Sequence, residues 1–187
     1  MTGLPLLTLL IAIPLAAGVL CLLVRDEGAR WIALAATLID LALSIYLWAN
    51  YNPDGPQWQF QELHPLGGGV NYALGIDGIA LLLIVLTAFL MPICIGASWR
   101  SIEKRVPEYM AYFLLMEALI MGSFAAQDLF LFYIFFEGGL IPMYLIIGVW
   151  GGAERIYASY KFFLYTLLGS VVMLLGLAAA ATWAMAG

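Results

Sequence analysis

The sequence predicts an all-α protein, a polytopic bundle of six transmembrane helices. Of the 187 residues, 65% are hydrophobic and only 10% are charged, a composition that excludes an ordinary soluble domain. A helix that crosses a bilayer needs about 20 apolar residues. A membrane β-barrel is excluded, since its strands read as alternating segments of about 10 residues. We expect residues 1–187 to form a single transmembrane domain with spans at about 2–24, 30–48, 78–99, 107–126, 128–150 and 160–184.

The longest connection, residues 49–77, is predicted to be an outer loop. Within it, the segment Gln57–Gln61 alternates polar and aromatic residues, which is typical of a short half-buried strand or hairpin. His64, the single histidine, lies in this loop, and we interpret it as structural. Asp77 and Asp128 directly precede the third and fifth spans, where an aspartate can cap the helix and favour its positive dipole end.

The basic residues predict how the chain crosses the membrane. The 49–77 loop and the short turn between the fourth and fifth spans contain no Lys or Arg. Because basic residues concentrate on the cytoplasmic side, we expect a multi-pass protein of the bacterial inner (plasma) membrane with its N-terminus outside. The mitochondrial inner membrane is the alternative. The basic residues, all in or beside the other connections, are Arg25, Arg30, Arg100, Lys104, Arg105, Arg155 and Lys161.

Two carboxylates are predicted to lie near the middle of the membrane. Glu137 follows Asp128 by nine residues, and Glu117 follows Pro107 by ten. At 1.5 Å per residue each lies about 14–15 Å from its helix end, near the centre of a core about 30 Å thick. A charge there costs at least about 2.5 kcal/mol. We interpret both as groups that bind and release protons, with a structural hydrogen bond as the alternative for Glu117.

Three more side chains are candidates for the same proton pathway. Tyr133 and Tyr144 lie four residues before and seven after Glu137, on the same helix face. Their hydroxyls can hydrogen-bond the carboxylate or hold water. Lys161 lies near the start of the sixth span on a stripe with tyrosines four residues to either side, and snorkelling to the interface is its alternative role.

Other unusual residues receive a structural interpretation. The pair Gly138–Gly139 and Pro142 are expected to loosen the helix just beyond Glu137. Asp40, within the second span and near no other polar residue in the sequence, is interpreted as a partner in a helix–helix hydrogen bond. Cys21 and Cys94 lack the spacing of a metal site or redox pair, so we expect buried free thiols.

Several motifs together resemble one family. Residues 135–144 (FFEGGLIPMY), 148–152 (GVWGG) and 161–166 (KFFLYT) are similar to the M chain of bacterial NADH:quinone oxidoreductase, the counterpart of mitochondrial chain 4 of respiratory complex I. Residues 75–79 (GIDGI) and 86–93 (LTAFLMPI) fit the same family. The resemblance covers the chain from residue 75 onward, and the two preceding spans are compatible with it.

The resemblance implies an antiporter-like, proton-translocating membrane-arm subunit that couples quinone reduction to proton pumping through buried Glu and Lys residues. Glu137 matches the family's fifth-helix glutamate, Glu117 the fourth-helix acid, and Lys161 a family lysine. The implied partners are the lipid bilayer and other membrane-arm subunits, and no nucleic acid. This chain is expected to hold no cofactor and no metal; FMN, iron–sulfur clusters and quinone would belong to partner subunits.

The resemblance also implies that more of the subunit exists. Family members have about fourteen helices arranged as inverted repeats, whereas this sequence ends at Gly187. We therefore expect the N-terminal part of such a subunit, from a longer or a split chain, without the lysine that pairs with Glu137. Two alternatives remain. One is a D-type subunit of a multisubunit cation/proton antiporter or a membrane hydrogenase, and the other is a structural membrane subunit without transport.

Overall fold

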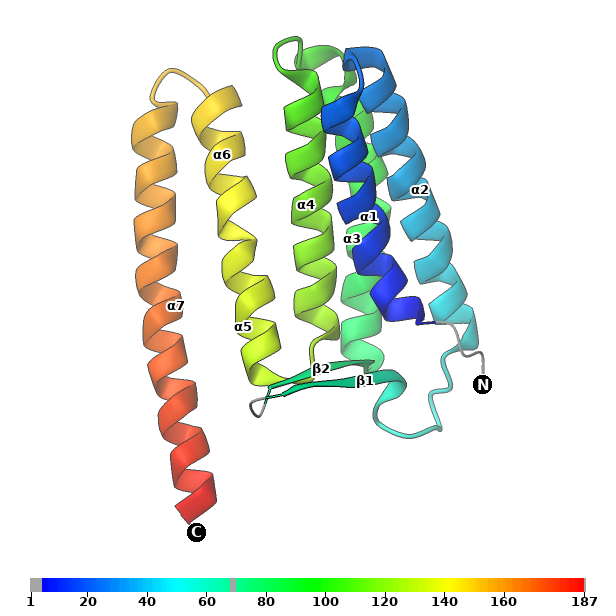
Figure 1. Ribbon diagram of the computed structural model, residues 1–187, viewed down its shortest axis with the longest axis vertical. Helices are drawn as coiled ribbons and strands as arrows, with labels where there is room; N and C mark the ends of the chain where they lie inside the picture. The colour runs from blue at the N-terminus through cyan, green and yellow to red at the C-terminus, as the bar shows by residue number, and fades with distance from the viewer. Residues whose placement is uncertain (1–4, 68–69, 187) are drawn as a thin grey trace. The chain divides into compact units, whose positions relative to one another are not determined.

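The computed structural model describes residues 5–67 and 70–186 (Figure 1). Six segments of this part are long and apolar enough to cross a membrane, which confirms the predicted number, and α5 and α6 together form the fifth. Residues 2–4 of the first predicted span lie outside the described residues. The helices are α1 (Leu6–Leu23), α2 (Asp26–Asn50), α3 (Gly78–Ser101), α4 (Val106–Ala125), α5 (Leu129–Gly138), α6 (Leu140–Trp150) and α7 (Arg155–Ala186).

The chain divides into two compact units, the first ending at Gly139 and the second beginning at Leu140. In the first unit, α2 packs against α1, α3 and α4, and α4 also packs against α1 and α5. Gly18 brings α1 close to α4, because a Cβ atom there would lie 3.3 Å from the carbonyl oxygen of Ala111. The first unit is therefore a tightly packed helical bundle, and side chains from several helices line its interior.

Two helices begin earlier than the hydropathy pattern predicts. α2 begins at Asp26, because Asp26 and Glu27 in its first turn favour the positive end of the helix dipole. Arg30 consequently lies inside the helix, where its Nη2 donates a 2.9 Å hydrogen bond to the carbonyl of Ile102. α7 begins at Arg155, five residues before the predicted start of the sixth span.

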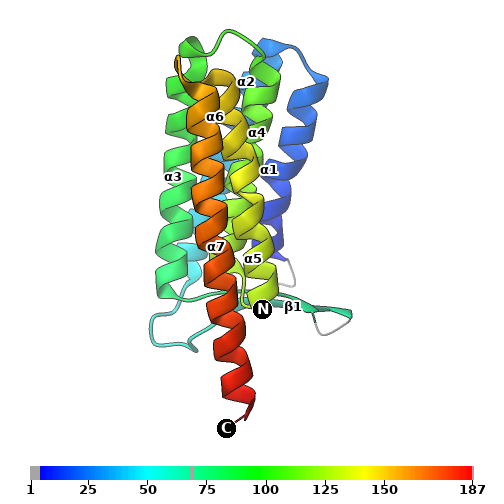
Figure 2. The same cartoon turned by 90° about the vertical axis from the view of Figure 1, so that its left-hand side faces the viewer.

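The 49–77 connection, predicted to be the outer loop, contains a β-hairpin of strands β1 (Gln59–Gly67) and β2 (Val70–Ile76), which are antiparallel. The predicted strand or hairpin is confirmed and is longer than the segment that indicated it. The hairpin lies at the opposite end of the first unit from the α1–α2 and α3–α4 turns (Figure 2). The backbone N–H of Gln127 donates a 2.8 Å hydrogen bond to the Ala73 carbonyl, so β2 holds the turn between α4 and α5.

Both predicted aspartate caps are confirmed. The Oδ1 atom of Asp77 accepts a 2.7 Å hydrogen bond from the N–H of Ala80 at the start of α3. The Oδ1 atom of Asp128 accepts from the N–H groups of Phe130 and Leu131, at 2.9 and 3.1 Å, at the start of α5. These caps satisfy backbone donors that a helix N-terminus otherwise leaves without partners.

The start of α1 is capped by a residue far away in the sequence. α1 follows Pro5 and has no cap from its own flanking side chain. Instead, the Glu62 carboxylate on β1 accepts hydrogen bonds from the N–H groups of Leu7 and Thr8, at 2.8 and 3.1 Å, and from the Thr8 hydroxyl. The Thr8 hydroxyl also lies 3.0 Å from the Tyr72 hydroxyl of β2. Burial raises the pKa of Tyr72, which keeps its hydroxyl protonated within this network.

The second unit consists of α6 and α7, joined by a short turn. Tyr144 of α6 packs against two rings of α7, Tyr160 at 6.0 Å and Phe163 at 5.5 Å between ring centroids. Arg155 donates a 3.1 Å hydrogen bond from Nη1 to the carbonyl of Val149, near the end of α6. Aromatic contacts and this arginine therefore hold the two helices of the pair together.

Both cysteines are free thiols, as predicted. Cys21 is buried, and its Sγ donates to the carbonyl of Ala29 at 3.4 Å. Cys94 on α3 is half-buried. Each therefore acts as a small, largely apolar side chain within the bundle.

Candidate functional site

Glu137 lies in the last turn of α5, directly before a break in the fifth span. The helix ends at Gly138 and α6 begins at Leu140, so the break is the single residue Gly139. Gly139 keeps helical backbone angles, and its N–H still donates a 3.1 Å hydrogen bond to the Phe135 carbonyl, so the predicted loosening beyond Glu137 is slight. The Glu137 side chain is half-buried, and its Oε1 atom is buried without a hydrogen-bond partner among the residues that the structure describes. Burying a polar atom without a hydrogen-bond partner costs free energy, so the structure favours a donor that reaches this oxygen from beyond the described residues.

Small residues let α4 approach α5 near Glu137. A Cβ atom on Gly138 would lie 3.1 Å from the Leu119 side chain, and one on Gly122 would lie 2.6 Å from the Phe135 ring. These glycines therefore set how closely the two helices pack. The close approach places the helix of Glu117 beside the helix of Glu137.

Glu117 is completely buried on α4, with an exposed fraction of 0%. Neither of its carboxyl oxygens has a hydrogen-bond partner within residues 5–67 and 70–186. The structure thus gives no support to the alternative in which Glu117 makes a structural hydrogen bond. A fully buried carboxyl group without partners favours the neutral, protonated form.

The interpretation of Asp40 as a hydrogen-bonding residue near no other polar group was wrong. Asp40 is also 0% exposed, and both its oxygens lack partners in the described part of the chain. It lies close enough to Glu117 for the two carboxyl groups to interact electrostatically. The sequence did contain a signal, because Thr37, Asp40 and Ser44 share one face of α2. All three are buried.

The other predicted site residues fall in both units. Tyr133 lies on α5, one helical turn before Glu137, and is half-buried. Lys161 is exposed on α7, with its Nζ atom 5.6 Å from the centre of the Tyr157 ring, which confirms that part of the predicted stripe. Tyr144 and Lys161 belong to the second unit and Glu137 to the first, so their joint action with Glu137 stays a prediction.

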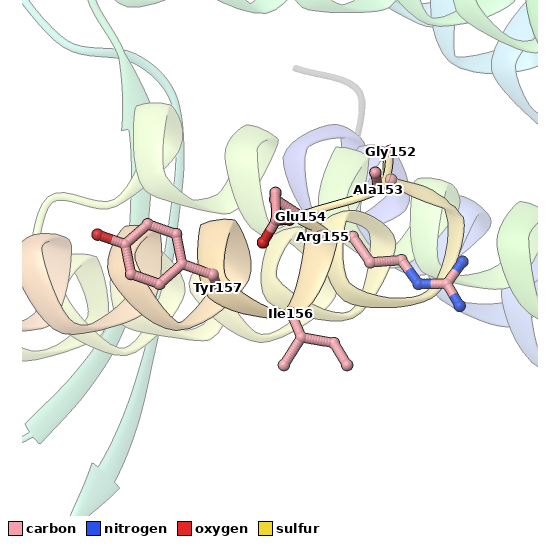
Figure 3. A pocket seen from close by; sticks show the side chains of 7 residues that line it. Gly152, Ala153, Glu154, Arg155, Ile156 and Tyr157 are labelled. Atoms are coloured by element: carbon pink, nitrogen blue, oxygen red, sulfur yellow. The ribbon is translucent and has the colours of Figure 1, made fainter.

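Two of the surface depressions formed by the described residues lie in the second unit. One, of about 280 Å³, runs along α7 and is lined by Tyr157, Tyr160, Lys161, Leu164 and Tyr165. The other, of about 580 Å³, lies at the turn between α6 and α7 (Figure 3). The side chains of Arg155, Ile156 and Tyr157 point away from one another there, so they do not converge on a ligand.

Comparison with known families matches almost the whole chain. Residues 6–126 match the family described as NADH-ubiquinone oxidoreductase chain 4, amino terminus. Residues 126–185 match the transmembrane family described as NADH:quinone oxidoreductase/Mrp antiporter. The two matches meet at residue 126, in the turn between α4 and α5.

Curated relatives carry the same names. NADH-quinone oxidoreductase subunit M of Rhodobacter capsulatus is 50% identical over 181 residues, covering 93% of this chain and 35% of the relative. NADH-ubiquinone oxidoreductase chain 4 of Prototheca wickerhamii is 42% identical over 190 residues, covering 90% of this chain and 36% of the relative. The chain thus spans 35 to 36% of the length of these two relatives.

A solved structure shows the same fold. A chain of the membrane-bound sulfane sulfur reductase, an archaeal respiratory membrane complex, superposes with a TM-score of 0.75 at 21% sequence identity. The match covers 92% of this chain and 36% of that one. The helical arrangement is therefore one that a respiratory membrane complex also uses.

Proposed function

The chain belongs to the family of NADH-quinone oxidoreductase subunit M and its counterpart NADH-ubiquinone oxidoreductase chain 4, and we propose that it carries protons across the membrane as part of that enzyme. The observation that carries this proposal is the buried, unpartnered Oε1 atom of Glu137, beside a helix break within an apolar span. Intramembrane carboxylates of this kind mark proton relays. Glu117 and Lys161 act in the same pathway, and Tyr133 and Tyr144 support it.

The mechanism we propose is electrostatic. NADH oxidation and quinone reduction take place in partner subunits that hold FMN and iron–sulfur clusters, and this chain contributes no redox step. A change passed along the neighbouring membrane-arm subunits moves a positively charged side chain toward or away from Glu137. A unit charge brought to about 10 Å, at an effective dielectric constant of about 20, changes the energy of a carboxylate by about 1.7 kcal/mol.

That energy is enough to load and unload a proton. One pKa unit corresponds to about 1.4 kcal/mol, so such a movement changes the proton affinity of a carboxylate more than tenfold. Glu137 is suited to respond because none of the described residues donates a hydrogen bond to its Oε1 atom, so no such bond holds the carboxyl group in one charge state. The break after Gly138 adds to this, since Pro142 has no N–H with which to continue the helical hydrogen bonds.

The test is the variant Glu137→Gln in the assembled enzyme. The amide keeps the size of the side chain but cannot bind and release a proton, so proton pumping is expected to fall by about 10² or more, as for loss of a positioned proton-transfer group. The measurement is proton uptake into sealed vesicles driven by NADH. Glu154→Gln, an exposed residue in the α6–α7 turn, is the matched control and is expected to pump normally.

Two results would contradict the proposal. Full pumping by the Glu137→Gln enzyme would remove Glu137 from the pathway. A smaller amount of assembled complex with unchanged turnover per complex would instead indicate a structural subunit.

The second candidate function, a subunit of a cation/proton antiporter or membrane hydrogenase, is favoured only by the family match shared with Mrp antiporters at residues 126–185. Purification with antiporter partners and sodium efflux, in place of flavin and iron–sulfur subunits, would support it.

We also propose an orientation in the bacterial plasma membrane, with the hairpin outside. The basic residues of the first unit lie at or near its α1–α2 and α3–α4 turns, opposite the hairpin (Figure 2). With Cys21 and Cys94 replaced by alanine, Asp54→Cys is expected to react with a membrane-impermeant maleimide added outside intact cells. Glu103→Cys, in the α3–α4 turn, is expected to react only in inverted vesicles. The reverse labelling would overturn the orientation.

A further inference from the structure

The interior of the first unit contains a pair of buried carboxyl groups in addition to Glu137. Asp40 on α2 and Glu117 on α4 are each 0% exposed. None of their four carboxyl oxygens has a hydrogen-bond partner in the described residues. The helices α2 and α4 pack against each other, and the two carboxyl groups interact electrostatically. The bundle thus encloses two acids where a packed core would hold apolar side chains.

The two acids lie at similar depths. α2 and α4 both begin at the end of the unit that carries the α1–α2 and α3–α4 turns (Figure 2). Asp40 lies fourteen residues into α2 from Asp26, or about 21 Å, and Glu117 lies eleven residues into α4 from Val106, or about 17 Å. Both carboxyl groups are therefore far from either end of the bundle and from water.

Within residues 5–67 and 70–186, the helices around the pair supply no positive charge at this depth. The buried hydroxyls of Thr37 and Ser44, beside Asp40, donate to backbone carbonyls of α2 itself, at 3.0 and 2.8 Å. The cations on the packed helices lie near the turns: Arg30 reaches the carbonyl of Ile102, and Arg100 lies in the last turn of α3. The other titratable groups on α1–α5 and β2, the elements that carry or pack against the pair, are Cys21, Asp26, Glu27, Tyr46, Tyr72, Cys94, Glu108, Tyr109, Tyr112, Tyr133 and Glu137.

Two ionised carboxylates cannot both persist in such a place. Each loses its hydration without a compensating partner, and two like charges close together disfavour simultaneous ionisation. At least one of the two groups must hold a proton. Resting on the proton-pumping function above, we propose that Asp40 and Glu117 form a proton-binding pair that stores a proton inside α1–α4 and exchanges it with the Glu137 pathway across the α4–α5 contact.

The pair is tested in the assembled enzyme with Asp40→Asn, Glu117→Gln and the double variant. The infrared carbonyl band of a protonated carboxyl group, identified by its shift in D₂O, is expected in the wild-type spectrum and absent from that of the double variant. Each single variant is expected to lower NADH-driven pumping by about tenfold or more. The double variant is expected to pump no worse than the weaker single variant, because the two acids act as a unit.

The control is Ser44→Ala, which removes a buried polar atom from the same face of α2 and is expected to change neither readout. If Asp40→Asn fails to assemble, Asp40→Leu serves, since an apolar side chain leaves no buried polar atom without a hydrogen-bond partner at this position. Wild-type pumping in the single variants would overturn the proposal. So would a double-variant spectrum with the same carbonyl band as the wild type. The infrared measurement does not depend on Glu137. The proposal for the Asp40–Glu117 pair can therefore be overturned while Glu137→Gln still abolishes pumping, and it can hold even if Glu137→Gln pumps normally.

Discussion

Replacing Gly122 with leucine is expected to prevent α4 from packing against α5 and to remove most of the subunit from the assembled complex. A Cβ atom on Gly122 would lie 2.6 Å from the Phe135 ring, closer than real Cβ contacts come. Overpacking by a few methylene groups costs about 1–3 kcal/mol or more, and leucine adds four carbons here. The measurement is the amount of subunit in purified membranes and its ratio to partner subunits.

The same substitution at a different glycine provides the control. Gly96 on α3 has no atom of the described residues within 4 Å of a Cβ position, so Gly96→Leu is expected to assemble at the wild-type level. The double variant Gly122→Ala with Phe135→Leu is expected to recover assembly relative to Gly122→Ala alone, because the smaller side chain makes room for the methyl group. Normal assembly of Gly122→Leu would show that α4 and α5 do not depend on this close approach.

Replacing Glu62 with alanine is expected to release the β1–β2 hairpin from the start of α1. The change removes one charged acceptor shared by two backbone N–H groups and a hydroxyl. Hydrogen bonds to charged groups are worth about 1.5–3 kcal/mol and helix caps about 1 kcal/mol. If the free energy of local opening falls by about 2 kcal/mol, the open form becomes roughly thirtyfold more populated. Protease added outside is then expected to cleave the 49–77 loop roughly thirtyfold faster.

A second glutamate shows what a weak surface contact contributes. Glu108 pairs with Arg105 three residues earlier in an exposed ion pair, and such pairs contribute about 0–1 kcal/mol. Glu108→Ala is therefore expected to leave the cleavage rate of the 49–77 loop unchanged. Glu62→Gln is expected to give an intermediate rate, since the amide oxygen still accepts a hydrogen bond but carries no charge. An unchanged rate in Glu62→Ala would show that the hairpin is held by other contacts.

Features that depend on neighbouring residues could be predicted from the sequence. The six spans follow from runs of apolar residues, the caps at Asp77 and Asp128 from their place before those runs, and the break after Glu137 from Gly138–Gly139 and Pro142. In each case the determining residues lie within one helix or one turn. The start of α2 at Asp26 was missed because hydropathy excludes charged residues that a helix dipole favours.

Features that depend on distant residues could not be predicted in this way. Glu62 caps a helix that begins 56 residues before it in the sequence, and no local pattern links the two. The environment of Asp40 is set first by its complete burial between helices and then by Glu117, which is 77 residues away and on another helix. The polar face formed by Thr37, Asp40 and Ser44 indicated burial of polar groups, but only the packing of α2 against α4 showed what faced it.

The hairpin imposes an order on biosynthesis. Glu62 of β1 binds the start of α1, which the ribosome has already released when residue 62 is made. By contrast, the carbonyl of Ala73 in β2 receives the N–H of Gln127 only after α3 and α4 have been synthesised and inserted. Contacts between residues far apart in sequence form late, because closing the loop costs entropy first. The strands β1 and β2 are therefore fixed in place only when four helices have been inserted, and until then an exposed sheet edge remains open to chaperones and proteases.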